Sequence, residues 1–143
     1  DNVTDFEQAA HLARKIKDTD GVEHIGTYSE TTRHAYHLFL MRYDRAQFNG
    51  IPRERFIQAV NAEGIPISPG YATGPLYKLQ AITGYRISGL QLDYSRVFLP
   101  VSEKACTEEG MWLPQTVLLG KKDDMDDIVD AIGKVKDNKS EIS

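Results

Sequence analysis

Two tyrosines and a lysine stand close together in a segment that is rich in glycine and proline. The segment SPGYATGPLYK, residues 68–78, holds Tyr71, Tyr77 and Lys78. A loop that leaves the end of a strand and is stiffened by prolines can hold phenolic hydroxyls over a polar ligand. The same segment would also suit a proline-bounded crossover whose tyrosines only pack. The spacing alone does not choose between these two interpretations.

Acidic residues cluster in KKDDMDD, residues 121–127, a composition that superficially resembles a divalent-cation site. A calcium-binding EF-hand loop needs oxygen ligands at alternate positions, a glycine at the sixth and a glutamate at the twelfth, and that frame is absent here. Aspartates in the first turn of a helix offset the helix dipole and accept hydrogen bonds from free backbone N–H groups. We therefore interpret the cluster as the start of a helix.

The histidines and the single cysteine do not form a recognisable reactive group. His34 and His37 lie three residues apart on a predicted strand, so they point to opposite faces and do not share a metal ion. Cys106 is expected to be a small core residue of a short helix. The sequence holds no GxSxG elbow, phosphate-binding glycine loop or dinucleotide fingerprint. We expect no metal site.

Hydrophobic periodicity predicts the elements that must position these residues. Helices are predicted over residues 5–18, 52–63, 102–109 and from 123 onward. Strands are predicted over 34–44, 65–68 and 111–119, with a short extended piece at 22–28. The strand 34–44 is apolar on both faces, which predicts an interior position in its sheet. Pro114 interrupts the strand 111–119 and predicts a bend or an edge.

Residues 69–101 show neither the helical nor the strand period. They are predicted to form a long loop region with one helical turn. Four of the seven tyrosines of the chain fall in this region, which argues against disorder because disordered segments are poor in aromatic residues. We therefore expect contacts to order the region, including contacts with parts that this chain lacks.

The composition excludes several classes of protein. The chain has 143 residues, of which 41% are apolar, enough for the core of one domain. Seventeen basic against 21 acidic residues give a net charge of −4, which disfavours nucleic acid as a partner. The longest apolar run, 38–41, is far shorter than the roughly 20 residues of a membrane helix. We expect a soluble, cytoplasmic domain that has no membrane partner and, because it begins at Asp1, is a fragment.

Seven stretches of the sequence, in their order and spacing, resemble one known family. They are HAYHLFLMRYD (34–44), GIPRERFIQAVNAEGIPISPGY (50–71), PLYK (75–78), DYS (93–95), LPVSEKAC (99–106), WLPQTVLLG (112–120) and DDMDDIVDAIGKV (123–135). Together they resemble the C-terminal small domain of DegT/StrS-type sugar aminotransferases, which are fold type I pyridoxal-phosphate enzymes. The resemblance runs from about residue 2 to residue 136.

The resemblance implies an α+β fold, with a small antiparallel sheet of about three strands and helices packed mainly on one face. Residues 1–136 would form the aminotransferase C-terminal small domain, within which 69–101 is the long aromatic loop region. Residues 137–143 are expected to be a flexible tail. The small domain would pack on an N-terminal large domain that is missing from this chain.

The resemblance also implies a reaction. The family moves an amino group from glutamate or glutamine to a keto group on a nucleotide-linked sugar or a cyclitol, with pyridoxal 5'-phosphate as cofactor. Its Schiff-base lysine, the aspartate facing the pyridine nitrogen and the phosphate-binding residues belong to the large domain. The cofactor is therefore expected to be bound mainly there, in a homodimer. We expect this chain to hold no catalytic residue and to be inactive alone.

Three residues are predicted to bind substrate. Many members of the family carry a His-Tyr pair after the short strand and a second histidine beyond the next proline. Here the pair is Gly70-Tyr71, and Tyr77 takes the place of the second histidine. Lys78 is the only lysine beside this loop, and no family motif makes it the Schiff-base residue. The GY and PLYK variants look like the branch that includes glutamine-dependent cyclitol aminotransferases.

An alternative hypothesis remains open at this stage. A non-catalytic binding or assembly module with the same architecture would work as a free chain. It would be favoured only if Asp1 were a genuine terminus, which the mass of the naturally produced protein would reveal.

Overall fold

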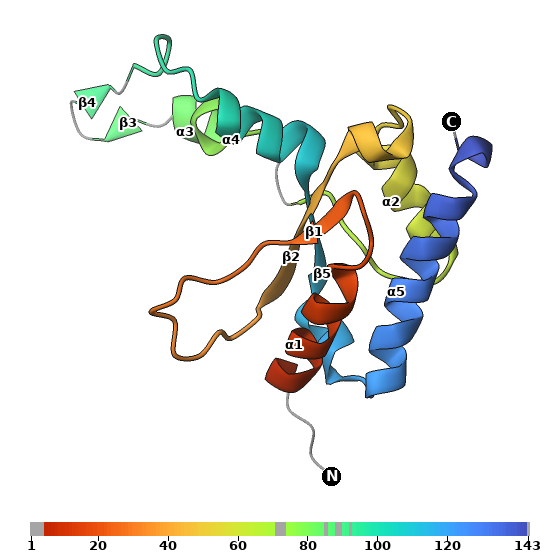
Figure 1. The fold of residues 1–143 in the computed structure, drawn as a ribbon. Helices are drawn as coiled ribbons and strands as arrows, with labels where there is room; N and C mark the ends of the chain where they lie inside the picture. The colour runs from red at the N-terminus through yellow and green to blue at the C-terminus, as the bar shows by residue number, and fades with distance from the viewer. Residues whose placement is uncertain (1–4, 71–73, 85, 88–89, 92, 143) are drawn as a thin grey trace.

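The protein is built on a three-stranded antiparallel sheet with helices mainly on one face (Figure 1). The computed structural model describes residues 5–70, 74–84, 86–87, 90–91 and 93–142. The strands of the sheet are β1 (Val22–His24), β2 (Leu38–Tyr43) and β5 (Gly110–Pro114), in the order β1-β2-β5. The α+β class and the small antiparallel sheet expected from the resemblance are confirmed.

Strand β2 occupies the centre of the sheet, as its apolar composition predicts. It pairs with β1 on one side and with β5 on the other. Phe39, Met41 and Tyr43 alternate along the strand and are all buried in the core. On the opposite face Leu40 is 40% exposed, so the apolar side chains of the two faces are not equally buried.

The central strand is shorter than the predicted 34–44 and begins at Leu38. Tyr36 interrupts the extended backbone because its φ angle is 45°. The N–H group of Tyr36 donates to Nδ1 of His34 at 2.9 Å instead of to a neighbouring strand. A side chain that bonds to nearby backbone in this way competes with strand pairing.

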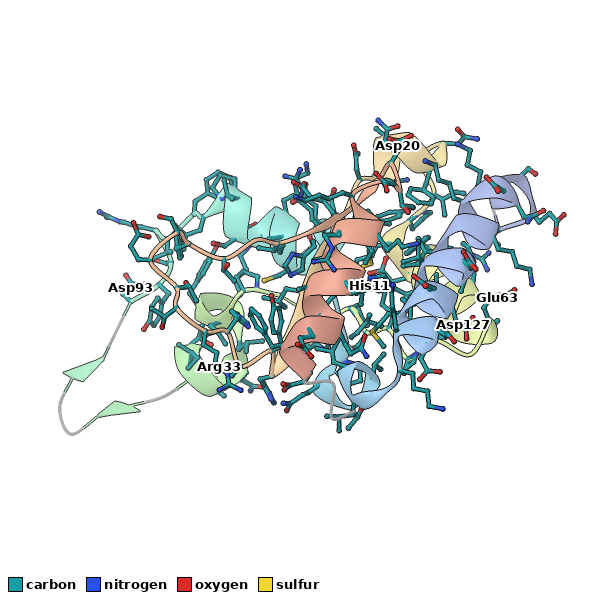
Figure 2. All side chains as sticks on the ribbon, turned by 60° about the horizontal axis from the view of Figure 1, so that its bottom comes forward. His11, Asp20, Arg33, Glu63, Asp93 and Asp127 are labelled. Carbon is teal, nitrogen blue, oxygen red and sulfur yellow. The ribbon has the colours of Figure 1, made fainter. Side chains whose placement is uncertain are left out.

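Three helices pack together over the sheet. They are α1 (Asp5–Ile16), α2 (Arg53–Ala62) and α5 (Lys122–Asp137). All three were predicted from apolar residues at helical spacing, and each buries that stripe in the common core. Where α1 meets α5, Nε2 of His11 lies 2.8 Å from Oδ1 of Asp126. Figure 2 shows the labelled side chain of His11 on the side of α1 that faces α5.

Three aromatic side chains form a buried cluster between α2 and the residues at the end of β2. The rings of Tyr43, Phe48 and Phe56 lie with each pair of centroids 4.9 Å apart. Phe48 belongs to the 3-10 helix η1 (Arg45–Phe48) that follows β2. The hydroxyl of Tyr43 donates to the carbonyl of Ile51 at 3.0 Å, so the buried phenol is satisfied.

The stretch 65–68, predicted as a strand, forms only one bridge to the sheet. Ser68 and Trp112 exchange two backbone hydrogen bonds of 3.0 Å each. One residue earlier, the side-chain amide of Asn61 donates to the carbonyl of Ile67 and accepts from its N–H. A side chain on α2 thus replaces the partner strand that this stretch would need.

The described residues between 74 and 101 extend away from the sheet and its helices, and we call them the projecting segment (Figure 1). Its elements are η2 (Leu76–Lys78), α3 (Gln80–Thr83), β3 (Arg86–Ile87), β4 (Leu90–Gln91) and the start of α4 (Pro100–Lys104). The region 69–101 therefore holds more structure than the loop with one helical turn that was predicted. These elements are too short for a hydrophobic period to be visible.

The segment returns to the sheet through a continuous helical stretch. Helix α4 passes directly into the π-helix η3 (Ala105–Glu109), which leads into β5. The predicted helix 102–109 begins earlier than expected, because Pro100 suits the first turn of a helix. After β5, Pro114 ends the predicted strand 111–119, and its remainder forms the 3-10 helix η4 (Gln115–Leu119).

The flexible tail predicted for 137–143 is described as far as residue 142, and residue 143 lies outside the described residues. Lys139–Glu141 form the 3-10 helix η5 after α5. The ammonium group of Lys139 donates to the carbonyl of Gln47 at 3.1 Å. Ile142 is partly buried against the core, and this apolar contact was not visible in the short polar tail of the sequence. Among the described residues, no helix has the length and apolar character that a membrane crossing requires.

Candidate functional site

An open pocket of about 770 Å³ lies on the projecting segment. Its lining residues are Tyr77, Lys78, Thr83, Asp93, Tyr94, Ser95 and Val97. Two of the three residues predicted to bind substrate, Tyr77 and Lys78, are thus brought to one pocket. The lining combines phenols, aliphatic hydroxyls, one ammonium and one carboxylate, which are groups that hydrogen-bond to a polyhydroxylated ligand. In Figure 2, Asp93 marks this end of the molecule, well apart from His11 in the helical layer.

Glu103 joins the two predicted residues from the side of helix α4. The Tyr77 hydroxyl donates a short hydrogen bond to Oε1 of Glu103. Nζ of Lys78 lies 2.7 Å from Oε2 of the same carboxylate. The sequence analysis missed Glu103 as a site residue, because a glutamate in the first turn of a helix is explained by the helix dipole alone. Glu103 lies 26 residues from Tyr77 in the sequence, so no local pattern connects the two residues.

The charges of this cluster reinforce one another. The hydrogen bond from Lys78, followed by the one from Tyr77, lowers the pKa of Glu103 below its usual value. The bond to Glu103 raises the pKa of Lys78, so its amine stays protonated. Desolvation, and then the bond to Glu103, raises the pKa of Tyr77. At neutral pH the cluster therefore consists of an ionised carboxylate, an ammonium and a neutral phenol.

A second carboxylate lies at the edge of the pocket. Oδ1 of Asp93 accepts the backbone N–H of Ser95 at 2.9 Å. This backbone hydrogen bond lowers the pKa of Asp93, which keeps the side chain ionised. Asp93 is exposed, so its charge is available to a ligand in the pocket. The pocket lining therefore offers one negative group in addition to the neutralised pair formed by Lys78 and Glu103.

The lysines of this chain do not suit the Schiff base of pyridoxal phosphate. A lysine that attacks a carbonyl must be a free amine, and proteins achieve this by burying it or placing it near another cation. Lys78 is ion-paired and has a raised pKa, which is the opposite arrangement. None of the other lysines in the described ranges is buried. They are Lys15, Lys17, Lys104, Lys121, Lys122, Lys134, Lys136 and Lys139. The residues present here therefore do not fit the reactive end of this cofactor.

The third predicted residue, Tyr71, lies outside the described residues, but the backbone that leads to it is defined. Gly70 has a φ angle of +119°, which side chains disfavour. A Cβ atom at Gly70 would also lie 3.2 Å from the ring of Trp112 on β5. Gly70 therefore lies in close contact with the side chain of a residue on β5.

The other candidate groups of the sequence take structural positions. Among the described residues, no group of histidine, cysteine, aspartate or glutamate side chains could hold a metal ion. In the acidic cluster, Asp124 accepts the backbone N–H of Lys121 at 2.5 Å, and so completes the start of α5. Asp126 pairs with His11 on α1. Cys106 is partly buried in η3.

The fold and the pocket together define a class of protein, an α+β domain that presents a polar pocket on a projecting segment. A solved structure of 3-amino-5-hydroxybenzoic acid synthase has this fold, with a TM-score of 0.64 and 18% sequence identity over 91% of this chain and 34% of that chain. Residues 3–133 match the model of the DegT/DnrJ/EryC1/StrS aminotransferase family. The chain belongs to this family, as the sequence resemblance predicted.

Three relatives carry the name L-glutamine:3-amino-2,3-dideoxy-scyllo-inosose aminotransferase. The one from Streptomyces kanamyceticus is 29% identical and matches 94% of this chain and 36% of its own length. The one from Streptoalloteichus tenebrarius is 30% identical over 84% of this chain and 32% of its own. The one from Micromonospora echinospora is 25% identical over 91% and 33%. This chain thus spans about a third of the length of the relatives it matches.

Proposed function

We propose that this chain is the C-terminal domain of a pyridoxal-phosphate-dependent aminotransferase that moves an amino group from glutamine or glutamate to a keto-cyclitol or keto-sugar. The observation that carries the proposal is the polar pocket with Tyr77 and Lys78 in its wall, in a chain of this family. The names of the three relatives specify glutamine and a cyclitol, which favours glutamine as the donor and a keto-cyclitol as the acceptor.

The proposed division of labour places the reactive centre outside this chain. Residues 1–136 would form the small domain and pack on an N-terminal large domain, which would bind most of the pyridoxal phosphate. The ion-paired state of Lys78 supports this division, because a lysine held as an ammonium is a poor nucleophile. The full-length protein is proposed to be a homodimer, because dimers with two-fold symmetry are the commonest soluble oligomers.

The contribution proposed for this domain is to bind and orient the amino acceptor. Lys78 would donate hydrogen bonds to its hydroxyl groups from the pocket wall, Tyr77 would accept one through its phenolic oxygen because its O–H is donated to Glu103, and Asp93 would be an acceptor at the edge. Tyr71 is proposed as a further substrate-facing residue on the family resemblance alone. Holding a substrate in one orientation lowers the entropy that the reaction itself must lose.

The experiment is an assay of the full-length gene product. L-glutamine and L-glutamate are supplied in turn as donors, each with 3-amino-2,3-dideoxy-scyllo-inosose and with a nucleotide-linked keto-sugar, and the aminated product is measured by mass spectrometry. We expect amination of the cyclitol with glutamine. Tyr77→Phe and Tyr71→Phe should raise the KM for the acceptor, whereas Tyr28→Phe should not, because Tyr28 is 86% exposed on another loop.

Two outcomes would contradict the proposal. The first is a full-length protein that aminates none of these acceptors with either donor. The second is that the naturally produced protein has about the mass of this chain, which would support the free binding or assembly module instead. Unchanged kinetics in Tyr77→Phe and in Tyr71→Phe would leave the family assignment intact and remove each residue from the site.

A further inference from the structure

Glu103 contacts the pocket only through other side chains. Its two carboxylate oxygens are divided between two partners, with Oε1 accepting from the Tyr77 hydroxyl and Oε2 2.7 Å from Nζ of Lys78. The Glu103 side chain is 23% exposed, and Glu103 is not among the residues that line the pocket. The carboxylate therefore supports the pocket wall through Tyr77 and Lys78 and is not itself one of the lining residues.

The backbone around Glu103 extends this support. Its N–H donates to the carbonyl of Leu99 at 2.9 Å within α4. The N–H of Leu99 in turn donates to the Tyr77 hydroxyl at 3.4 Å. Tyr77 is thus held at its oxygen by two groups of the same helical stretch, and a displacement of α4 would move the phenol with it.

The helical stretch is itself anchored to the core. Nη1 of Arg53 on α2 donates to the carbonyl of Cys106 at 3.0 Å and to that of Gly110 at 2.7 Å. Arg53 is buried, with 6% of its surface exposed. The C-terminal end of this helical stretch is therefore bonded to the body of the domain. Glu103 lies on the same stretch and connects it to Tyr77 and Lys78 of the pocket wall.

The charge balance at the wall restricts the ligand. Among the described residues of the lining, Lys78 is the cation, and Glu103 neutralises it at 2.7 Å. The other charged group among these described lining residues is the ionised carboxylate of Asp93. A phosphate or diphosphate group would meet a neutralised cation and a like charge, whereas hydroxyl and amino groups would find acceptors and donors.

We propose that Glu103 is the positioning and specificity-determining residue of this pocket. It holds Tyr77 and Lys78 against the wall, and by neutralising Lys78 it selects an uncharged or cationic polyhydroxylated ring over an anionic, phosphorylated group. This inference rests on the proposed function in one respect: that the ligand of the pocket is the amino acceptor. It adds that the part of the acceptor bound in this pocket carries no phosphate.

The first test measures the positioning role in the 143-residue chain, without catalysis. The ring carbons of tyrosine are labelled with ¹³C, and the pH titration of Tyr77 is followed by NMR, its signal being identified by its loss in Tyr77→Phe. In Glu103→Gln the pKa of Tyr77 should fall, because the phenol loses its negative neighbour. Glu109→Gln is the matched control: it removes a carboxylate that pairs with Lys104 at 2.7 Å, and it should leave Tyr77 unchanged.

The second test measures the selection against anions, with inorganic pyrophosphate as the probe. Glu103→Gln should bind pyrophosphate about fivefold more tightly than the unsubstituted chain, as expected from removing one charge about 4 Å away in a solvated site. Glu109→Gln should bind as the unsubstituted chain does. The gain should disappear in the double variant Glu103→Gln, Lys78→Gln, because the released cation is then absent.

The outcomes separate this inference from the proposed function. An unchanged Tyr77 titration in Glu103→Gln would overturn the positioning role. Pyrophosphate binding that is not tighter, or a gain that persists without Lys78, would overturn the selection role. Both readouts stand whether or not the full-length protein transfers an amino group. If the full-length protein transfers an amino group, Glu103→Gln should raise the KM for the acceptor roughly tenfold with less effect on kcat. Glu103→Asp should raise the KM less, because it keeps the carboxylate.

Discussion

The guanidinium group of Arg53 satisfies two backbone carbonyls at the end of a π-helix. Carbonyl groups at the end of a helix have no partner within it, and a buried one that is left unpaired costs free energy. The two bonds to Cys106 and Gly110 meet this need, and Glu54 balances the charge at 2.7 Å. Sequence reasoning gave no reason to single out this arginine, because arginine in the first turn of a helix is ordinarily solvated.

Arg53→Ala is expected to lower the free energy of unfolding by about 2–3 kcal/mol, since it leaves two carbonyls without a donor and removes the packing of the buried aliphatic stem. The measurement is urea unfolding followed by circular dichroism. Arg55→Ala, two residues along the same helix and exposed, should change the value by less than about 0.5 kcal/mol. Equal losses in the two variants would show that Arg53 is not an anchor.

Tyr43 should give the protein a distinct response to alkaline pH. Burial raises its pKa from 10.0 to about 12. Below pH 10 the phenol is protonated in both the folded and the unfolded states, and its contribution to stability is complete. Between pH 10 and about 12 the unfolded state loses the proton first, so the free energy of unfolding falls as the pH rises.

Tyr43→Phe should reduce this alkaline slope and should also cost about 1–2 kcal/mol at neutral pH, because the carbonyl of Ile51 loses its donor. The measurement is urea unfolding at a series of pH values from 8 to 12. The exposed Tyr28 serves as the control, and Tyr28→Phe should leave the slope unchanged. A slope that is the same in all three proteins would assign it to other groups.

At the scale of elements, Gly70 marks the close contact between the backbone that follows α2 and strand β5. Two independent causes disfavour a side chain at this position, the positive φ angle and the Trp112 ring. Gly64 has a positive φ of +91° as well, but nothing lies within 4 Å of a Cβ atom built there. The two glycines therefore separate backbone strain from steric contact.

Gly64→Ala should cost about 1 kcal/mol through backbone strain alone. Gly70→Ala should cost more, because the Trp112 ring must also move. Trp112 is the single tryptophan of the chain, so its fluorescence emission reports the displacement directly. We expect a shifted emission in Gly70→Ala and an unchanged one in Gly64→Ala. An identical spectrum in both variants would contradict the contact with the ring.

At the scale of the whole molecule, the body and the projecting segment differ in how they are stabilised. None of the buried apolar residues of the core lies between 74 and 101 in the described part of the chain. Large apolar side chains of the segment are instead exposed: Leu76 at 69%, Phe98 at 72% and Val101 at 82%. Exposed apolar surface of this kind is typical of a site that contacts another surface. It agrees with packing on the proposed large domain.

Replacing residues 74–98 by a Gly-Ser linker should therefore change the Tm of the 143-residue chain by less than about 4 °C, measured by calorimetry. The same replacement in the full-length protein should abolish amino transfer, since it removes Tyr77 and Lys78. A large fall in Tm would show that the segment belongs to the core after all. The helix-anchor variant Arg53→Ala provides the comparison, because it should lower the Tm although it leaves every residue of the pocket lining in the chain.

The amino-acid sequence by itself determined the elements whose side chains repeat with a clear period. Helices α1, α2 and α5 and the central strand β2 were predicted because apolar residues must share one face to be buried, and this requirement is written in local spacing. The family was likewise identified from the order of several motifs, and Tyr77 and Lys78, which were predicted to bind substrate, line one pocket.

Only the tertiary structure decided which distant groups meet. Glu103 lies 26 residues from Tyr77, and their contact depends on how α4 returns to the sheet. Asn61 replaces a partner strand for Ile67, and Tyr36 shortens β2 by a turn of its backbone. Such contacts depend on three-dimensional approach and leave no period in the sequence, because a single hydrogen bond constrains one pair of residues and no repeating face.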